Sequence, residues 1–472
     1  MMSVYDLVYE SLITIDDDYM PQGQLAQSWE HNSSGKQWTF YLRPGVSFSD
    51  GTPLTAQDVV ASARFILDLA NDENIADHGF YSNLKYFISG ISAENESTVV
   101  VKTTAKRPYY GLLYAMTFPV VPASMVDSDN PPGTGPYRIG VFQAGNYMQL
   151  EANKLWWQTQ PQVKYISFYF HDAQNAVMES YEYKRADAVF TRSIGGAQYK
   201  SGISSLAISY RTNQLECLLM NNTAPELTKE VRMAIRYVVD VAAIASKVYS
   251  GMVTPCNLPF WPGNWTYNDS LSSFFTKNIE EARRLIEEAG WGDSDENGVM
   301  DKLNSEGKKV NLHLRFYVYE EPENDVRVEA ANMIADMLAE VGIEAKVDTL
   351  SLSEVQSKLS AGSYDLALVS YAMDVCPDPG FMLMSGNTGN YARYKSERMT
   401  RLFDTLRTRV TQSEYRQTLL EIQSVFAEDC PFICLFWRNG RVLSDYMYTT
   451  VRDVREYELL RGIESFHTNP AQ

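Results

Sequence analysis

Residues 38–60 read WTFYLRPGVSFSDGTPLTAQDVV, and this stretch decides the fold. Trp38, Phe40 and Leu42 alternate with more polar neighbours, which is the period of a half-buried strand. Two turns that contain glycine follow the strand. Thr55 then provides a helix N-cap, and the apolar spacing after it predicts a helix over 56–69. The stretch therefore predicts strand, turn, turn and helix.

Length and composition set the broad class of the protein. A chain of 472 residues exceeds one hydrophobic core, so we expect at least two lobes. Hydrophobic residues make up 45% and charged residues 21%, which is typical of soluble globular proteins. The net charge of −18 argues against nucleic acid or an anionic membrane as the main partner. It serves either solubility alone or a field that favours cationic ligands.

The first residues and the positions of the cysteines and histidines bear on the leader peptide, on zinc binding and on disulfides. Residues 1–5 have no basic or apolar region of a signal peptide, so we expect a removed leader or a truncated gene. The scattered histidines and the absence of CxxC argue against a zinc site. Cys430 and Cys434 either form a disulfide, if a helix carries them, or remain buried free thiols. The odd count of five cysteines leaves at least one free thiol even if the others pair.

The rest of the chain predicts further elements and one tight turn. GTGPY at 133–137 lacks the ending of a phosphate loop, and we interpret it as a turn with glycines at positive φ. The later half alternates helices and strands, which predicts a mostly parallel sheet with helices on both faces. Expected helices cover 107–115, 172–184, 229–240, 279–289, 325–341, 353–361, 396–409 and 412–429. Expected strands cover 163–170, 186–190, 310–319, 344–350, 364–370 and 431–437.

Four motifs together carry a resemblance to one family. They are residues 38–60, GTGPY at 133–137, NKLWW at 153–157 and KEVRMAIRYVVD at 229–240. With them the chain resembles the bacterial extracellular solute-binding proteins of family 5, from about residue 4 to residue 441. Members of this family feed peptides, nickel chelates and some sugars to ABC importers.

The resemblance implies an α/β fold of the large two-lobed periplasmic-binding-protein type II (cluster C), with an extra small inserted domain. Lobe one would contain residues 1–37, 133–220 and 438–472, and the small domain residues 38–132. Lobe two, which binds the ligand, would contain residues 221–437. The hinge is expected near residues 220–222 and 438–440.

The resemblance also implies a function without catalysis, and GxSxG, HExxH, GxGxxG and Walker motifs are absent. We expect a monomeric receptor that captures a short peptide between its lobes and delivers it to an ABC permease and ATPase at the membrane. It would be extracytoplasmic, lipid-anchored in its full-length form, and would bind no nucleic acid. The alternatives are a nickel chelate or an oligosaccharide as ligand, or a sensor receptor without transport.

Ligand-binding candidates follow from strand ends and from the family. Asp374 comes just after the strand 364–370, where ligands sit in α/β sheets, and resembles the aspartate that holds a peptide's α-amino group in the family. The spacing leaves Asp378 as the alternative. Tyr371 and Trp437 are candidate aromatic walls, and Trp437 is equally a core residue.

A cation for the ligand's carboxylate is expected on the strand 310–319. Arg315 lies there with Tyr317 on the polar face, and dipeptide-binding family members use an arginine near this strand for the terminal carboxylate. The alternative is a solvated arginine on the strand.

Residues 293–301, DSDENGVMD, begin like a calcium loop. The ligands would come from Asp293, Asp295, Asn297, the backbone of Val299, and Asp301. Position 12 of the loop is not the glutamate of an EF-hand, so the alternative is a turn without metal. No cofactor is required, and structural calcium is the only candidate.

Overall fold

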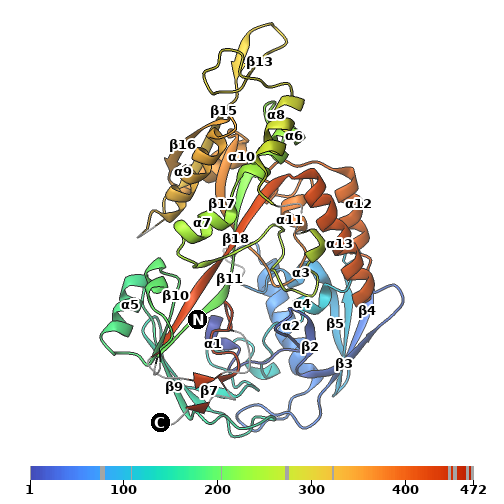
Figure 1. The fold of residues 1–472 in the computed structure, drawn as a ribbon. Helices are drawn as coiled ribbons and strands as arrows, with labels where there is room; N and C mark the ends of the chain where they lie inside the picture. Colours follow the sequence, from blue (N-terminus) through green and yellow to red (C-terminus); the bar gives the residue numbers. More distant parts are fainter. Residues whose placement is uncertain are drawn as a thin grey trace. The chain divides into compact units, whose positions relative to one another are not determined.

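The computed structural model describes residues 2–74, 80–107, 109–202, 205–271, 276–321, 324–444, 448–449, 454–463 and 467–468. The chain forms two compact units. Unit 1 contains residues 1–211, 405–416 and 440–472, and unit 2 contains residues 212–404 and 417–439. Two neighbouring long strands, β11 (Leu206–Met220) and β18 (Phe432–Ser444), begin in one unit and end in the other (Figure 1).

Unit 1 is rich in strands, and its described residues form a four-stranded sheet, a three-stranded sheet and two sheets of two strands, while β10 pairs with β18. Its strands are β1 (Ile13–Ile15), β2 (Pro21–Gly23), β3 (Ala26–His31), β4 (Gln37–Leu42), β5 (Ile88–Asn95), β6 (Thr98–Thr103), β7 (Tyr137–Gln143), β8 (Tyr147–Ala152), β9 (Tyr165–Tyr169), β10 (Ala188–Thr191), β19 (Tyr448–Thr449) and β20 (His467–Thr468). Its helices are α1 (Met2–Tyr5), α2 (Ala56–Asn71), α3 (Leu84–Phe87), α4 (Leu112–Ala115), η1 (Ala123–Met125), α5 (Gln174–Glu182) and η2 (Ile194–Gln198).

The stretch at 38–60 folds as predicted. Trp38 and Phe40 are fully buried on β4, in a sheet of order β3-β4-β6-β5. The backbone N–H of Thr55 donates a 2.8 Å hydrogen bond to Asp58 Oδ2, so Asp58 closes the N-terminus of α2. Local pattern and capping chemistry agree here, which is why the prediction was confirmed.

The glycines of the GTGPY segment are required for a different reason than the one predicted. Neither Gly133 nor Gly135 has a positive φ, so the interpretation as a left-handed turn was wrong. The N–H groups of Gly135 and Tyr137 instead donate 2.9 Å hydrogen bonds to the carbonyls of Val8 and Leu7. Glycine is needed because the two backbones approach so closely; a Cβ on Gly135 would lie 2.6 Å from the Leu7 oxygen.

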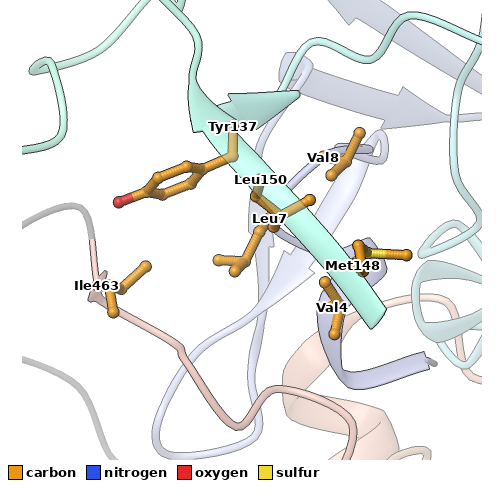
Figure 2. Packing of buried hydrophobic residues seen from close by; sticks show 7 residues of the cluster. All are labelled: Val4, Leu7, Val8, Tyr137, Met148, Leu150 and Ile463. Carbon is orange, nitrogen blue, oxygen red and sulfur yellow. The ribbon is translucent and has the colours of Figure 1, made fainter. Parts of the chain in front are cut away.

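This close approach positions a core cluster at the chain's N-terminus. Val4, Leu7 and Val8 lie against side chains from β7 and β8 and from the C-terminal segment (Figure 2). The other buried members of the cluster are Tyr137, Met148, Leu150 and Ile463.

Replacing Gly135 by Ala is expected to destabilise unit 1 by about 1–3 kcal/mol, because the added methyl group overlaps backbone that cannot move without breaking two hydrogen bonds. Gly292 is the matched control, since a Cβ there meets nothing within 4 Å and its φ is not positive. Calorimetric melting of both variants checks this, and equal melting temperatures would contradict the argument.

Unit 2 contains the alternating helices and strands that were predicted for the later half of the chain. Its strands, besides most of β11 and the first part of β18, are β12 (Val253–Pro255), β13 (Asp301–Leu303), β14 (Lys309–Asn311), β15 (His313–Tyr319), β16 (Glu344–Leu350) and β17 (Leu366–Ala372). Its helices are α6 (Lys229–Val238), α7 (Val241–Lys247), α8 (Ile279–Glu288), α9 (Val326–Ala339), α10 (Leu352–Ala361) and α11 (Gly380–Leu383), with most of α12 (Glu397–Leu406) and α13 (Gln412–Asp429).

The sheet of unit 2 is mixed, so the prediction of a mostly parallel sheet was wrong. Its strand order is β18-β11-β17-β15-β16, and β12 pairs with β18. Strand β15 is parallel to β16 and β17, and the helices α9 and α10 connect these strands along the chain. In contrast, β11 runs antiparallel to β17, and β12 runs antiparallel to β18.

Most other predicted elements were confirmed within about three residues of their expected ends, the usual uncertainty of element boundaries. The helix predicted over 107–115 is only α4, and the strand predicted over 310–319 is broken into β14 and β15. The strand predicted over 431–437 is longer than expected, because β18 continues to Ser444. All five cysteines are free thiols; Cys430 follows α13 and Cys434 lies in β18, so no helix joins the pair predicted as one alternative. None of the described helices is both long and apolar enough to cross a membrane.

Candidate functional site

The carboxyl ends of β15 and β17 lie at one edge of the unit 2 sheet because the two strands are parallel. Ligands of α/β proteins bind at such an edge. The middle of β11 lies beside the carboxyl end of β17, since Glu216 of β11 pairs with Ser370 near that end. This edge is therefore the candidate site.

A closed group of four charged side chains lies at this edge, and we name Glu216, Glu321, Arg327 and Arg438 the Glu216 cluster. Arg327 donates to both oxygens of Glu216, at 2.6 and 2.9 Å, and to Glu321 at 2.8 Å. Arg438 donates from Nε to Glu216 at 2.6 Å and from Nη2 to Glu321 at 2.9 Å. The Ser370 hydroxyl adds a 2.8 Å hydrogen bond to Glu216.

The charges of the Glu216 cluster balance, and this is why the cluster can be buried. Glu216 and Arg327 are 0% and 1% exposed, whereas Arg438 is 18% exposed. Burial alone would raise the pKa of Glu216, but Arg327 and Arg438 outweigh it and hold this pKa below its ordinary value. Glu216 is therefore ionised at neutral pH, and Arg438 is the partly exposed arginine of the cluster.

Asp374 and Tyr371 lie at or just beyond this end of β17. Asp374 is exposed, and its Oδ1 accepts a 3.3 Å hydrogen bond from the Cys376 N–H. The alternative residue, Asp378, instead accepts a 3.0 Å bond from the N–H of Gly380. Tyr371 is buried, and its hydroxyl donates to the Gly389 carbonyl at 2.9 Å. The carboxylate of Asp374 is thus the more accessible of the two, and its ligand role stays a prediction.

Arg315 lies at the opposite edge of the sheet, so the structure does not bring it together with Asp374. It is the third residue of β15 and forms a two-point ion pair with Asp365, at 3.0 Å from Nε and 2.9 Å from Nη2. Asp365 precedes β17, nine residues before Asp374. Tyr317, two residues further along β15, is buried with Lys358 above its ring. A role of Arg315 and Tyr317 in ligand binding stays a prediction.

Trp437 is a buried residue of β18. Its ring centroid lies 4.7 Å from that of Trp261, and its Nε1 donates a 3.4 Å hydrogen bond to the Phe260 carbonyl. These contacts are those of a core side chain, which was one of the two interpretations of this residue.

The loop predicted to bind calcium brings three carboxylates together and adds a lysine. Ligand oxygens of Asp293, Asp295 and Asp301 lie within 4.8 Å of one another. Lys309 Nζ lies 2.5 Å from Asp295 and 3.0 Å from Asp301, so an ammonium group already neutralises them. Asn297 and Val299 take part in local turn hydrogen bonds, with Asn297 Oδ1 accepting from the Val299 N–H. Calcium binding stays a prediction.

Sequence reasoning missed the Glu216 cluster. The signal present in the sequence is a charge beside an apolar strand, in Glu216 before CLLM and Arg438 after FICLFW. Charged residues are almost never fully buried unless they are paired. The pattern thus indicates a paired charge, but it does not identify the partner.

Comparison with known proteins gives the family. The sequence profile of the bacterial extracellular solute-binding proteins, family 5 Middle, matches residues 20–393. The oligopeptide-binding protein AppA of Bacillus subtilis (strain 168) is 23% identical over 489 residues, which cover 96% of this chain and 86% of AppA. The structure of AppA with a nonapeptide has a TM-score of 0.68 and 19% identity, covering 99% of this chain and 94% of AppA. NikA from Brucella suis with Fe(III)-EDTA has a TM-score of 0.81 and 18% identity, covering 99% and 95%.

The chain belongs to the bacterial extracellular solute-binding proteins of family 5. Its fold is the mixed α/β fold of cluster C periplasmic binding proteins, as expected. The protein is a non-catalytic substrate-binding protein of an ABC transporter.

Proposed function

We propose that the ligand of this protein is a short peptide with free termini, which the protein delivers to the permease and ATPase of an ABC importer. The proposal rests on one observation, the exposed carboxylate of Asp374 beyond the carboxyl end of β17. A carboxylate in this place is suited to a ligand ammonium group through charge-assisted hydrogen bonds. The similarity to AppA, whose name and structure concern peptides, agrees with this choice.

The first experiment is native mass spectrometry of the freshly purified protein, followed by denaturation and identification of what is released. The protein is then incubated with randomised di- to pentapeptide pools that have free, N-acetylated or C-amidated termini. The proposal expects released or captured peptides with a free amino group. A released nickel chelate or oligosaccharide, or no retention from any pool, would overturn it.

Asp374→Asn is expected to raise the Kd for a peptide captured from the free pool by about 10–100-fold, about 1.4–2.7 kcal/mol. The reason is that the amide removes the negative charge that the peptide's ammonium needs. Titration calorimetry measures this effect. Asp348→Asn removes a partly exposed carboxylate on β16 and serves as the control. An Asp374→Asn variant that binds like the wild type would contradict the assignment, and the same loss in Asp378→Asn would transfer it to Asp378.

A further inference from the structure

A cavity of about 310 Å³ lies within unit 2 near the amino end of β17, at the edge of the sheet opposite the candidate ligand site. Its wall includes Asn222, which follows β11, and residues 393–396, which lead into α12. The Asn222 N–H donates to the Ala392 carbonyl at 2.9 Å, and Asn221 Nδ2 donates to the Tyr364 carbonyl at 2.9 Å, two residues before β17. Hydrogen bonds between distant segments therefore fix this wall, and the cavity has the volume of a small-molecule site.

Three cationic side chains line the cavity, namely Arg232, Arg393 and Lys395. Arg232 donates to three main-chain carbonyls at 2.9–3.0 Å, and Arg393 donates from Nη2 to the Ser360 carbonyl at 2.8 Å. Within the described part of the chain, no carboxylate lies within ion-pair distance of any of the three. The protein therefore satisfies part of their hydrogen-bonding capacity but does not pair their charges.

The cavity also contains one carboxylate, that of Asp429, and its charge is compensated separately. Asp429 Oδ2 accepts a hydrogen bond from the Tyr394 hydroxyl, and Oδ1 lies 3.7 Å from Lys229 Nζ. Lys229 is not among the residues that line the cavity. The three lining cations thus remain in excess, in contrast to the Glu216 cluster, where two arginines face two glutamates.

An unpaired positive charge in this place is unfavourable for the protein alone. Burial lowers the pKa of Arg232 below its ordinary value, as it does for a desolvated cation. A bound anion restores the lost compensation. Because the chain has a net charge of −18 and repels anions overall, saturable anion binding requires such a local group of cations.

The number and arrangement of the cations favour one class of anion. A phosphoryl group has up to two negative charges and several acceptor oxygens, so it can pair with more than one cation at a time, whereas a single carboxylate has one charge. Arg393 is held in position, because its guanidinium packs on Gly362, where a Cβ would lie 2.2 Å from Arg393 Nε. Lys395 is exposed, so an anion from solvent can reach it.

We propose that this cavity binds a phosphoryl group through Arg393 and Lys395, with Arg232 adding positive charge from the buried wall. The site lies at the opposite edge of the sheet from Asp374, and its ligand class differs from the proposed peptide, so the two proposals stand or fall separately. Inorganic phosphate and phospholipid headgroups share the required chemistry, and the test distinguishes them.

The first measurement is calorimetric titration of inorganic phosphate into the whole protein at pH 8 and constant ionic strength, with acetate as the monocarboxylate for comparison. We expect saturable phosphate binding with a Kd of about 1 mM or below, and binding of acetate about tenfold weaker. Lys395→Gln is expected to raise the Kd for phosphate about tenfold by removing a charge-assisted hydrogen bond, without affecting peptide binding. Lys247→Gln is the matched control, since Lys247 is an exposed lysine of α7 outside the cavity.

Vesicles identify the source of the phosphoryl group. Capture of the protein by phosphatidylglycerol vesicles but not by phosphatidylcholine vesicles, reversed by phosphate and lost in Lys395→Gln, assigns the site to a lipid headgroup. Calorimetric binding without vesicle capture assigns it to free phosphate. The proposal is overturned if the wild type shows no saturable phosphate binding, if acetate binds as tightly, or if Lys395→Gln binds phosphate like Lys247→Gln. Since Lys395 is exposed, its substitution tests the charge without disturbing the fold.

Discussion

Glu216→Gln is expected to lower the free energy of unfolding of unit 2 by about 3–5 kcal/mol, the usual cost of breaking a buried ion pair. The substitution keeps the shape of the side chain and its acceptor for Ser370, but it removes one of two negative charges. Arg327 and Arg438 then share Glu321 alone, and one buried positive charge has no counterion. The measurement is urea unfolding, with hydrogen exchange of the β11 and α9 amides as the local probe.

A double substitution separates charge balance from packing. Glu216→Gln combined with Arg327→Gln leaves the neutral pair of Arg438 and Glu321, so we expect it to recover more than half of the lost stability. Glu281→Gln is the matched control, because Glu281 pairs with Arg284 at the solvent-exposed surface, and no resolvable change is expected. If the double variant is less stable than Glu216→Gln, charge balance is not what holds the cluster.

The second large effect concerns Glu10 in unit 1. Glu10 is 2% exposed, and its carboxylate accepts hydrogen bonds from Trp156 Nε1 at 3.2 Å and Trp157 Nε1 at 2.8 Å. Burial raises its pKa from 4.5 to about 7, although the two indole donors and Arg43 lower it. The motif NKLWW thus meets the N-terminal segment at a buried carboxyl group.

This raised pKa makes the stability of unit 1 depend on pH in a stated direction. The folded state holds the Glu10 proton more tightly than the unfolded state between about pH 4.5 and 7, so the free energy of unfolding falls as the pH rises through this window. The full loss is about 3 kcal/mol, because each tenfold difference in proton affinity between the two states is worth about 1.4 kcal/mol. The loss is nearly complete about one pH unit above the folded pKa, and the stability then stays constant with respect to Glu10.

Glu10→Gln isolates this effect, because Gln resembles the protonated glutamic acid at every pH. The wild type is expected to lose about 2.5 kcal/mol relative to the variant between pH 5 and pH 8, because part of the full loss occurs below pH 5. Calorimetry of both proteins at pH 5, 6, 7 and 8 measures the difference, and the other titrating groups cancel in it. A difference that does not change with pH would show that Glu10 titrates normally.

Local elements of this protein follow from local sequence. The alternation in β4, the cap at Thr55 and the period of α6 each involve interactions within a few residues, and the structure confirms all three. The four motifs also sufficed for the family. The glycines of GTGPY show the limit, since their partners are carbonyls of Leu7 and Val8, more than 120 residues earlier.

The sequence by itself therefore determined the elements, the family and the strand end that carries Asp374. Only the tertiary structure decided which charges meet there. Glu216 pairs with Arg327 across 111 residues and with Arg438 across 222, and Arg315 lies at the other edge. The physical reason is that alternation and helical period specify which face of an element is buried. The neighbour on that face depends on strand order and register, which long-range packing sets.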